Sequence, residues 1–409
     1  MKIKDIACRG CGQTGLRMVL DLGETPLADG LLTLDKLDKT ERVYPLEVAF
    51  CPECSLVQIL KTVPPDELFC RDYPYYSSFS EELLRHSRDN VSSLIESRGL
   101  GAESLVVELA SNDGYLLKNF VEKGIPCLGI DPADGPAMAA EEAGVPTLCA
   151  FFSKELAEQL SGVGRRADVI IANNVLAHVS DVSGFLAGIK ILLKKNGVAS
   201  IEVPYVRDLI DNCEFDTIYH EHLCYFSATS IDRLLRRNSL YLNDIKRLSI
   251  HGGSLRLYVG LKDEPGEAVT TLLAAEKALG INEFEYYRDF AVKVSNIREG
   301  LRMMLLGLKE EGKRIAAYGA AAKGSTLLNY IGIGRNVLDF VADRNIHKQG
   351  RFMPGTRIPI CGPEQLSKRM PDYVLILAWN FAEEIIRQQE NYRQQGGKFI
   401  LPIPVWKIT

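Results

Sequence analysis

Two cysteine pairs, each with the spacing C-x-x-C, tie together two distant points near the start of the chain. Cys8 and Cys11 form the first pair, and Cys51 and Cys54 form the second. Each pair brings two sulfurs together at a tight turn, and two pairs complete the tetrahedral thiolate shell that zinc prefers. Because four thiolates leave no open coordination position, we expect a structural zinc site, with 12–50 forming a hairpin or a small subdomain. Unconnected buried cysteines and a redox dithiol are the alternatives.

Length, net charge and composition exclude several classes of protein for this chain. At 409 residues it is too long for one hydrophobic core and predicts two or three domains. A formal net charge of −5 argues against nucleic acid as a partner, because phosphate contacts need a basic surface. The N-terminus lacks the apolar core of a signal peptide, no apolar run approaches the roughly 20 residues that span a bilayer, and the remaining cysteines are scattered. We expect a cytoplasmic monomer without a membrane partner.

Short apolar runs alternate with helix-like segments in two parts of the chain. The first part has expected strands at 104–109, 126–131, 167–172 and 198–203, with helices at 81–97, 114–123, 133–142 and 181–194. After an irregular stretch at 204–226, a helix at 229–237 and strands at 240–248 and 254–261 follow. A helical region at 267–311, broken near Gly280, precedes strands at 314–318, 337–342, 373–378 and 398–402. This pattern is typical of parallel sheets with crossover helices, so we predict an α/β fold with three domains, at 1–70, 71–262 and 263–409.

A polar turn follows the strand expected at 104–109, at the edge of the sheet where ligands collect. It carries the carboxylates Glu108 and Asp113 and has neither G-x-G-x-x-G nor the Lys-Ser/Thr of a phosphate-binding loop. Carboxylates disfavour a pyrophosphate but suit a cationic, hydroxyl-bearing ligand such as S-adenosylmethionine (SAM). Asp131, at the end of the next strand, is placed to accept hydrogen bonds from ribose hydroxyls. The alternatives are helix N-caps for Glu108 and Asp113 and a solvated strand end for Asp131.

Taken in order, these features predict a SAM-binding domain that resembles the class I methyltransferase fold. The strand expected at 167–172 also ends in polar residues, which begin at Asn173. The expected cofactor-binding residues come from three strand ends: Glu108, Ala110, Asn112, Asp113, Gly114, Leu117, Asp131, Pro132, Asn173 and Asn174.

The stretch 216–227 holds the densest collection of acid and base groups in the chain. His220 and His222 flank Glu221, and Tyr219 precedes them. Residues two apart do not share a helix face, so the two histidines can point together only from a strand or loop. With no third ligand nearby, a metal site is disfavoured, and a general acid–base cluster is expected because imidazole titrates near neutral pH. Histidines that are hydrogen-bonded in a packed loop are the alternative, above all for His220.

A second glycine-containing turn, at 319–326, follows a strand and opens a helix in the C-terminal part. Small residues let backbone amides approach a phosphate, and the helix N-terminus with Lys323 adds positive potential. We expect this turn to hold the diphosphate of a sugar nucleotide, through Lys323, Gly324 and Ser325, with Lys348 assisting from the next strand exit. Small residues that permit close packing of the helix on the sheet are the alternative.

These motifs together resemble the sugar-nucleotide C-methyltransferases, three-domain enzymes with an N-terminal zinc-binding domain. The resemblance covers the paired cysteines, the turn at 108–114, Asn-Asn-Val-Leu-Ala-His at 173–178, the motif at 219–227, His-Gly-Gly-Ser at 251–254 and the turn at 319–324. It implies a SAM-dependent enzyme that methylates the carbon beside the ketone of a nucleotide-linked 4-keto-deoxysugar. One departure is Ala110, where the family is expected to have glycine; its methyl group should tighten the cofactor pocket.

The resemblance also implies roles for individual residues. Its catalytic positions match Tyr219, Glu221 and His222, with His178 and a tyrosine of the loop at 73–76 (Tyr75 or Tyr76) lining the site. In the chemistry this implies, His222 removes the proton next to the ketone, Glu221 orients it or tunes its pKa, and Tyr219 donates to the developing enolate oxygen. Much of the rate should come from positioning the two substrates.

Two functions of other classes compete with this interpretation. An NAD-dependent oxidoreductase could use the C-terminal alternation, but Ala-Ala-Ala-Lys-Gly at 320–324 is not the dinucleotide fingerprint. A non-enzymatic zinc-ribbon regulator could bind nucleic acid, but the acidic balance of the chain and the cluster at 219–227 argue against it. The sequence does not identify the sugar, the nucleotide or the methylated carbon.

Overall fold

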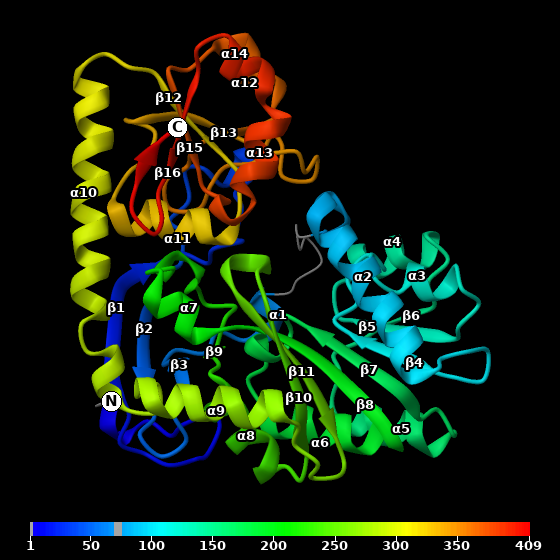
Figure 1. The fold of residues 1–409 in the computed structure, drawn as a ribbon. Helices are drawn as coiled ribbons and strands as arrows, with labels where there is room; N and C mark the ends of the chain where they lie inside the picture. The colour runs from blue at the N-terminus through cyan, green and yellow to red at the C-terminus, as the bar shows by residue number, and fades with distance from the viewer. Residues whose placement is uncertain (1–2, 69–75) are drawn as a thin grey trace.

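A computed structural model describes residues 3–68 and 76–409 of the chain. The strands of this part form three sheets of four, seven and six strands, which follow one another along the sequence with one exception. A long helix runs along one side of the molecule, beside the N-terminal and C-terminal parts (Figure 1). None of the described helices is long and apolar enough to cross a membrane.

The first sheet belongs to the cysteine-containing N-terminal part. Its strands are β1 (Arg17–Thr25), β2 (Tyr44–Phe50), β3 (Val57–Ile59) and β9 (Cys224–Tyr225), paired antiparallel in that order. The first two strands confirm the hairpin-like structure expected between the cysteine pairs. β9 is the exception to the sequence order: it follows β8 in the chain but belongs to the first sheet. It lies within 204–226, which was expected to be irregular. This sheet therefore contains a strand that begins two residues after His222.

The second sheet has the order β10-β11-β8-β7-β4-β5-β6. Its parallel part consists of five strands: β4 (Val106–Leu109), β5 (Cys127–Asp131), β6 (Thr147–Cys149), β7 (Ala167–Asn173) and β8 (Leu193–Pro204). Two antiparallel strands extend it: β10 (Tyr241–Leu248) and β11 (Ser254–Gly260). The core strands are almost fully buried, as expected for a sheet covered on both faces.

Helices of the middle part lie on the two faces and ends of this sheet: α1 (Pro65–Leu68), α2 (Glu81–Arg98), α3 (Lys118–Val121), α4 (Asp134–Glu142), α5 (Lys154–Gly162), α6 (Val182–Leu192), α7 (Val206–Asp211) and α8 (Ala228–Arg237). Four of these begin at a serine or aspartate whose side chain accepts a hydrogen bond from the first helical turn: Ser80, Ser153, Asp181 and Ser227. The helix expected at 114–123 is wrong in length. Residues 114–117 form turns instead, after the left-handed residues Asn112 and Gly114.

Two helices connect the second sheet to the third. α9 (Glu267–Leu279) ends at Gly280, which has the left-handed conformation common at helix ends. α10 (Phe290–Glu310) then runs along one side of the molecule and contacts β1 as well as the C-terminal part (Figure 1). The break predicted near Gly280 is confirmed.

The third sheet has the order β14-β13-β12-β15-β16-β17. Its strands are β12 (Ile315–Tyr318), β13 (Leu338–Ala342), β14 (Ile360–Cys361), β15 (Tyr373–Ile376), β16 (Lys398–Leu401) and β17 (Lys407–Ile408). The helices beside them are α11 (Ala322–Ile331), α12 (Glu364–Arg369), α13 (Ala382–Gln388) and α14 (Glu390–Gln394). All strands except β17 pair in parallel, which confirms the second α/β alternation.

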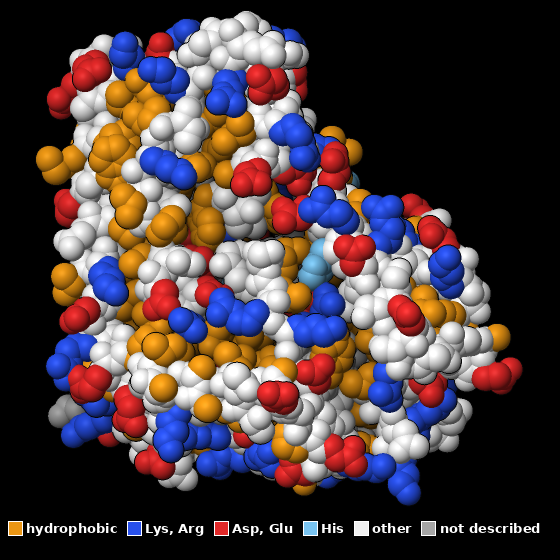
Figure 2. Space-filling view, in the orientation of Figure 1, with side chains coloured by type: hydrophobic (Ala, Val, Ile, Leu, Met, Phe, Trp, Pro, Cys, Tyr) orange, Lys and Arg blue, Asp and Glu red, His pale blue; other side chains and the backbone are white. Residues whose placement is uncertain are grey.

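The surface is hollowed between the C-terminal part and α2, and histidine atoms are visible in this hollow (Figure 2). Contacts across it join both parts. The ring of Tyr76 stacks on His347, with ring centroids 4.5 Å apart, and Arg344 forms an ion pair with Glu81 at 3.9 Å. The turn at the carboxyl end of β4 also reaches this region, because Asn112 and Asp113 accept hydrogen bonds from the amides of Ser77 and Ser78.

Candidate functional site

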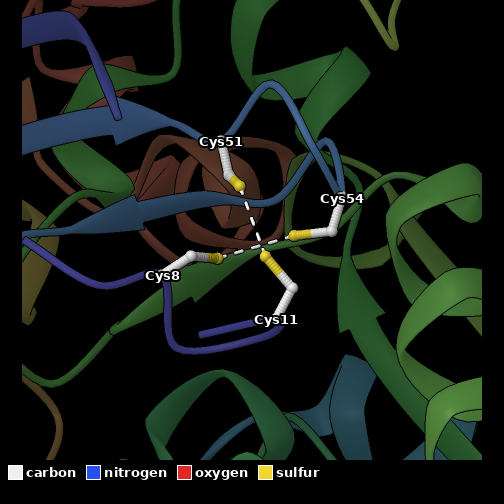
Figure 3. Close-up of side chains that lie close together, drawn as sticks. All are labelled: Cys8, Cys11, Cys51 and Cys54. Atoms are coloured by element: carbon white, nitrogen blue, oxygen red, sulfur yellow. Dashed lines mark hydrogen bonds between the residues drawn. The ribbon is translucent and has the colours of Figure 1, made fainter. Parts of the chain in front are cut away.

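The four N-terminal cysteines converge on one point (Figure 3). The sulfurs of Cys8 and Cys54 are 3.5 Å apart, those of Cys11 and Cys51 are 3.6 Å apart, and all four lie within 4.8 Å of one another. Sulfurs that surround zinc at about 2.3 Å in a tetrahedron are separated by about 3.8 Å. The donor set and its spacing therefore fit zinc. Among residues 3–68 and 76–409, no other group of three or more such donors is close enough to hold a metal.

The turn after β4 is shaped by residues with positive φ. Ala110 has φ 56°, Asn112 has φ 49° and Gly114 has φ 73°. Only glycine adopts this region at little cost, which gives a physical reason why glycine is expected at position 110. A side chain on Gly114 would come within 3.0 Å of Val145, so this position also needs glycine for packing.

Three buried carboxylates surround this turn. Glu108 is 1% exposed, and its pKa is raised well above the ordinary value by burial and by the charges of Asp131 and Asp113. Oε2 of Glu108, Oδ1 of Asp113 and Oδ1 of Asn173 are buried and have no hydrogen-bond partner among the described residues. Unpaired buried acceptors are costly unless a ligand supplies donors. The hydroxyl and ammonium groups of SAM supply such donors, and its sulfonium adds a positive charge that suits the carboxylates.

Asp131 is the last residue of β5, and its carboxylate is hydrogen-bonded to the turn that follows β4. Its Oδ2 accepts a hydrogen bond from the amide of Asn112 at 2.8 Å, and its Oδ1 accepts one from the amide of Ala133 at 2.9 Å. Burial raises the pKa of Asp131. Because each carboxylate oxygen has two lone pairs, both oxygens retain capacity for ribose hydroxyls. Asp131 therefore has two tasks, since it also fixes the turn.

Not every expected cofactor residue reaches this edge. Leu117 has no exposed surface and lies in the apolar core with Val106 and Phe120, so its assignment to the cofactor pocket is wrong. Pro132 is partly exposed beside Asp131. Asn174 has φ 55°, and its amide donates to the carbonyl of Glu202 at 2.9 Å. This hydrogen bond ties the segment that follows β7 to β8.

A short helical turn, η3 (Ser77–Phe79), packs on the turn after β4 and donates two hydrogen bonds to it. The amide of Ser77 donates to Oδ1 of Asn112 at 2.9 Å, and the amide of Ser78 donates to Oδ2 of Asp113 at 3.1 Å. Tyr76 precedes this segment and stacks on His347. Tyr75, the other tyrosine predicted to line the site, lies outside the described residues.

Two of the predicted acid–base residues, Tyr219 and His222, form a cluster in the loop that precedes β9. Nε2 of His222 is 2.9 Å from the phenolic oxygen of Tyr219, and Nδ1 is 2.8 Å from the carbonyl oxygen of Thr217. A carbonyl only accepts, so Nδ1 carries the proton and Nε2 accepts a hydrogen bond from the Tyr219 hydroxyl. This tautomer leaves Nε2 as the basic atom of His222.

His178 completes the cluster from η4 (Leu176–His178). Its ring centroid is 4.8 Å from that of His222, with an edge-on arrangement. Burial lowers the pKa of His178 to about 4, although the backbones of Glu221 and Asn174 oppose this shift. His178 is therefore neutral at pH 7. Tyr219, His222 and His178 are all partly exposed.

Glu221 differs from its expected role as the group that orients His222. Thr217 and Tyr219 form the hydrogen bonds of the His222 ring, whereas Glu221 is 2% exposed and lies beside Asp29. Burial, and then the charge of Asp29, raise the pKa of Glu221 to about 8.

His220 is a packing residue. It is fully buried, its Nε2 is 3.3 Å from the carbonyl oxygen of Pro45, and its ring packs edge-on against Tyr44. Burial lowers its pKa. His220 therefore fits the alternative stated for it, a histidine that is hydrogen-bonded in a packed loop rather than an acid–base group.

Two residues of the C-terminal turn, Gly324 and Ser325, pack against the interior of the protein. A side chain on Gly324 would come within 2.8 Å of Leu377, so its small size permits packing of α11 on the sheet. Ser325 is 2% exposed and its hydroxyl donates to the carbonyl of Ala28 at 2.7 Å. The Ser325 hydroxyl is thus bound within the protein, and a role of Gly324 and Ser325 in holding a diphosphate rests on their backbone amides alone and stays a prediction.

The two lysines of this region are held by protein groups. Nζ of Lys323 donates to Oδ1 of Asn380 at 2.8 Å and lies 4.5 Å from the ring centroid of Trp379. Burial lowers the pKa of Lys323, while Asp216 and Glu214 oppose this shift. Nζ of Lys348 donates to the carbonyl of Ala320 at 2.7 Å. Lys323 is partly exposed, whereas Lys348 is 6% exposed, so Lys323 is the better placed to meet a ligand.

Sequence reasoning missed three residues that shape this region. Thr217 orients His222 through its carbonyl, Asp29 shifts the pKa of Glu221 from the N-terminal part, and Asp216 accepts a hydrogen bond from Trp379 at 2.7 Å. A backbone carbonyl leaves no trace in residue type. The other two contacts join residues that are 192 and 163 positions apart (221 less 29, and 379 less 216).

Three family models match consecutive parts of the chain. A model described as "Putative zinc binding domain" matches residues 8–69, one described as "Methyltransferase domain" matches 79–243, and one described as "C-methyltransferase C-terminal domain" matches 249–404. Among curated proteins, C-methyltransferase NovU of Streptomyces niveus is 38% identical over 400 residues, which cover 97% of this chain and 95% of that protein. A ubiquinone biosynthesis O-methyltransferase of Azorhizobium caulinodans is 31% identical over 120 residues, or 28% of this chain and 45% of that protein.

Solved structures give weaker likenesses. The magnesium protoporphyrin IX methyltransferase ChlM of Synechocystis PCC 6803, with bound SAM, matches with 15% identity and a TM-score of 0.34, over 44% of this chain and 81% of that one. The 1,6-didemethyltoxoflavin-N1-methyltransferase of Burkholderia thailandensis matches with 17% identity and a TM-score of 0.36, over 51% of this chain and 96% of that one.

Proposed function

Because this chain belongs to the C-methyltransferase family, as its identity to NovU over nearly its whole length shows, we propose that it methylates a nucleotide-linked 4-keto-deoxysugar. The methyl group would go to the carbon next to the ketone. Family membership makes the protein a SAM-dependent C-methyltransferase with a zinc-binding domain. It favours methyl transfer over the two alternatives, an NAD-dependent oxidoreductase and a zinc-ribbon regulator.

The observation that carries the proposal is the position of the acid–base cluster. β7 and β4 are neighbouring parallel strands, so their carboxyl ends lie at the same edge of the sheet. The turn after β4 bears the carboxylates that fit SAM, and the segment after β7 bears His178, which packs on His222. A substrate held by this cluster would lie next to the methyl donor, as transfer requires.

His222 is the proposed general base. SAM supplies an electrophilic methyl group on a sulfonium when it is bound. Nε2 of His222 takes the proton from the carbon next to the ketone, and the electrons of that C–H bond form the enolate. Because the single lone pair of Nε2 accepts the Tyr219 hydrogen bond, that hydroxyl turns to donate to the enolate oxygen as Nε2 takes the proton, or its oxygen takes the proton from carbon while its own proton passes to Nε2.

Other residues are proposed to bind the substrate. His178, which burial keeps neutral, would contact the sugar as an uncharged hydrogen-bonding group. Tyr76 and Lys323, which come from two different parts of the chain, would contact the sugar nucleotide, as would Tyr75. We keep the division into domains at 1–70, 71–262 and 263–409 as a proposal, together with the monomeric state and the cytoplasmic location.

A substrate screen tests this function directly. The purified protein is incubated with SAM and with 4-keto-deoxysugars linked to dTDP, GDP or CDP, and methyl transfer is followed by mass spectrometry. Addition of one methyl group to at least one of these sugars, on carbon rather than oxygen, is the expected result. Methylation of none of them, by protein that binds S-adenosylhomocysteine, would contradict the proposed substrate class.

A further inference from the structure

β9 links the N-terminal module to the proposed catalytic loop. It begins two residues after His222 and pairs with β3, where Val57 lies opposite Tyr225 and Gln58 lies opposite Cys224. The amide of Ile59 also donates to the carbonyl of Leu223 at 3.1 Å. Backbone hydrogen bonds of this kind set the register and the separation of the two paired segments. The chain that follows His222 is therefore held by the sheet of the zinc-binding module.

The side chain of Gln58 joins that strand to the cysteine cluster. Its Nε2 donates to Sγ of Cys8 at 3.1 Å, and its Oε1 accepts a hydrogen bond from the amide of Arg9 at 3.0 Å. Gln58 is 1% exposed, so neither bond is weakened by water. A second bond supports this link, because Arg9 donates to the carbonyl of Ile59 at 3.1 Å.

Leu223 carries the link onward to the second histidine. Its amide donates to the carbonyl of Ala177 at 2.7 Å, and Ala177 directly precedes His178. A shift of β9 would therefore change the position of His178 as well as that of His222. The two histidines approach each other from different elements, and this strand lies between the zinc-binding module and both of them.

We propose that Gln58 is a positioning residue that couples the zinc-binding cysteines to the acid–base cluster through β3 and β9. It touches no substrate and moves no proton. Its side-chain amide holds the sulfur of Cys8, while its neighbours Val57 and Ile59 in β3 pair with the chain at β9. This inference rests on the proposed function, since it takes His222 and His178 as the groups being positioned. A displacement of a catalytic group by about 1 Å can cost a hundredfold in rate, so such a link matters for turnover.

The test compares Gln58→Met with a matched control in the same sheet. Methionine keeps the length of the side chain but lacks both hydrogen-bonding groups. The control is Thr25→Val at the far end of the sheet, where the buried Thr25 hydroxyl bonds only to the carbonyl of the next residue, at 3.3 Å. Three quantities are measured on each holoenzyme: the rate of zinc release to a chromogenic chelator, amide hydrogen exchange in the peptide 221–226, and kcat and KM for both substrates.

The coupling predicts a joint change in the Gln58→Met variant. Zinc should be released about three- to tenfold faster, amides of 221–226 should exchange at least about threefold faster, and kcat should fall roughly tenfold with KM for SAM unchanged. Thr25→Val should match wild type in all three. Faster zinc release with wild-type exchange in 221–226 would overturn the coupling, whatever the role of His222. Faster exchange with unchanged kcat would leave the coupling standing and contradict the proposed role of the cluster instead.

A second variant guards against loss of folding. Gln58→Glu keeps an oxygen for the Arg9 amide but places a carboxylate against Sγ of Cys8. Because a negative charge next to a thiolate is unfavourable, this variant should release zinc faster than Gln58→Met and show the larger increase in exchange of 221–226. Equal exchange of 221–226 in Gln58→Glu and wild type would also overturn the proposal.

Discussion

Nε2 of His222 accepts a hydrogen bond from the hydroxyl of Tyr219, with 2.9 Å between the two atoms. The opposite ring nitrogen donates to the carbonyl of Thr217, which fixes both the tautomer and the plane of the ring. The basic nitrogen of the cluster, Nε2 of His222, is thus hydrogen-bonded to the Tyr219 hydroxyl in the protein without substrate. This arrangement suits the removal of a proton from carbon, because the base is oriented before the substrate arrives.

Replacement of His222 by asparagine tests the general base. Asparagine retains polarity and part of the size but takes up no proton at neutral pH. We expect normal binding of both substrates and a loss of about 10²–10⁴ in turnover. Wild-type protein with 4-keto sugar and S-adenosylhomocysteine in deuterated water should incorporate deuterium at the future branch carbon, as seen by NMR, and the variant should not.

The neighbouring histidine provides the control for this experiment. His220→Asn removes a buried packing ring, so it should lower the melting temperature while the folded fraction retains deuterium exchange. Exchange at the wild-type rate in the His222 variant would assign the base to another residue, and Tyr219→Phe would then be the next variant to measure.

The pKa of Glu221 predicts a specific dependence of stability on pH. Its folded-state pKa of about 8 lies above the ordinary value of 4.5, so the folded protein binds more protons than the unfolded chain between these values. The contribution of Glu221 to stability is therefore greatest at low pH and falls as the pH rises through this window, by up to about 5 kcal/mol. Glu221→Gln, which stays neutral, should remove this slope.

Urea unfolding of wild type and Glu221→Gln at intervals between about pH 5 and pH 8 measures this effect. The difference in unfolding free energy, wild type minus variant, should decrease steadily with pH. A difference that is constant with pH would mean that the carboxylate of Glu221 is already charged in the folded protein. Asp29 faces Glu221, so Asp29→Asn should lower the pH at which the decrease occurs.

Asp131 is expected to contribute to binding of the methyl donor. Asp131→Asn removes the charge that would accept ribose hydroxyls, and we expect SAM to bind more weakly by about 1–3 kcal/mol. Calorimetric titration with S-adenosylhomocysteine measures this loss. Asp134→Asn, on the exposed start of α4, removes the same charge nearby and should bind like wild type. Equal weakening of sugar-nucleotide binding in the Asp131 variant would indicate a folding defect instead.

The zinc site should contribute to folding. One zinc per chain is expected by metal analysis, and Cys51→Ser should lower both zinc content and melting temperature, because a closed four-cysteine site adds folding energy. Cys361→Ser, outside the cluster, should have wild-type zinc content. A Cys51 variant with full stability and reduced turnover would be incompatible with a structural role.

Local sequence patterns identified the elements that depend on neighbours in the chain. Cysteine spacing predicted the zinc site, because two residues of a C-x-x-C pair approach each other through a local turn. Apolar runs predicted the strands of both parallel sheets, because a strand that is buried on two faces needs them. The turn at 109–114 was found from its carboxylates, since the end of one strand and the start of the next helix are contiguous.

Only the tertiary structure decided which way individual side chains face. Ser325 and Gly324 fit a phosphate-binding turn by residue type, yet packing of α11 against Leu377 and the Ala28 carbonyl turns them inward. Glu221 faces Asp29 rather than His222, and β9 joins a sheet whose other strands end more than 160 residues earlier, at Ile59. Residue type and spacing specify local conformation, because those interactions span a few residues. The partners of a buried charge or a two-residue strand are set by contacts between distant segments, which form only when the whole chain packs.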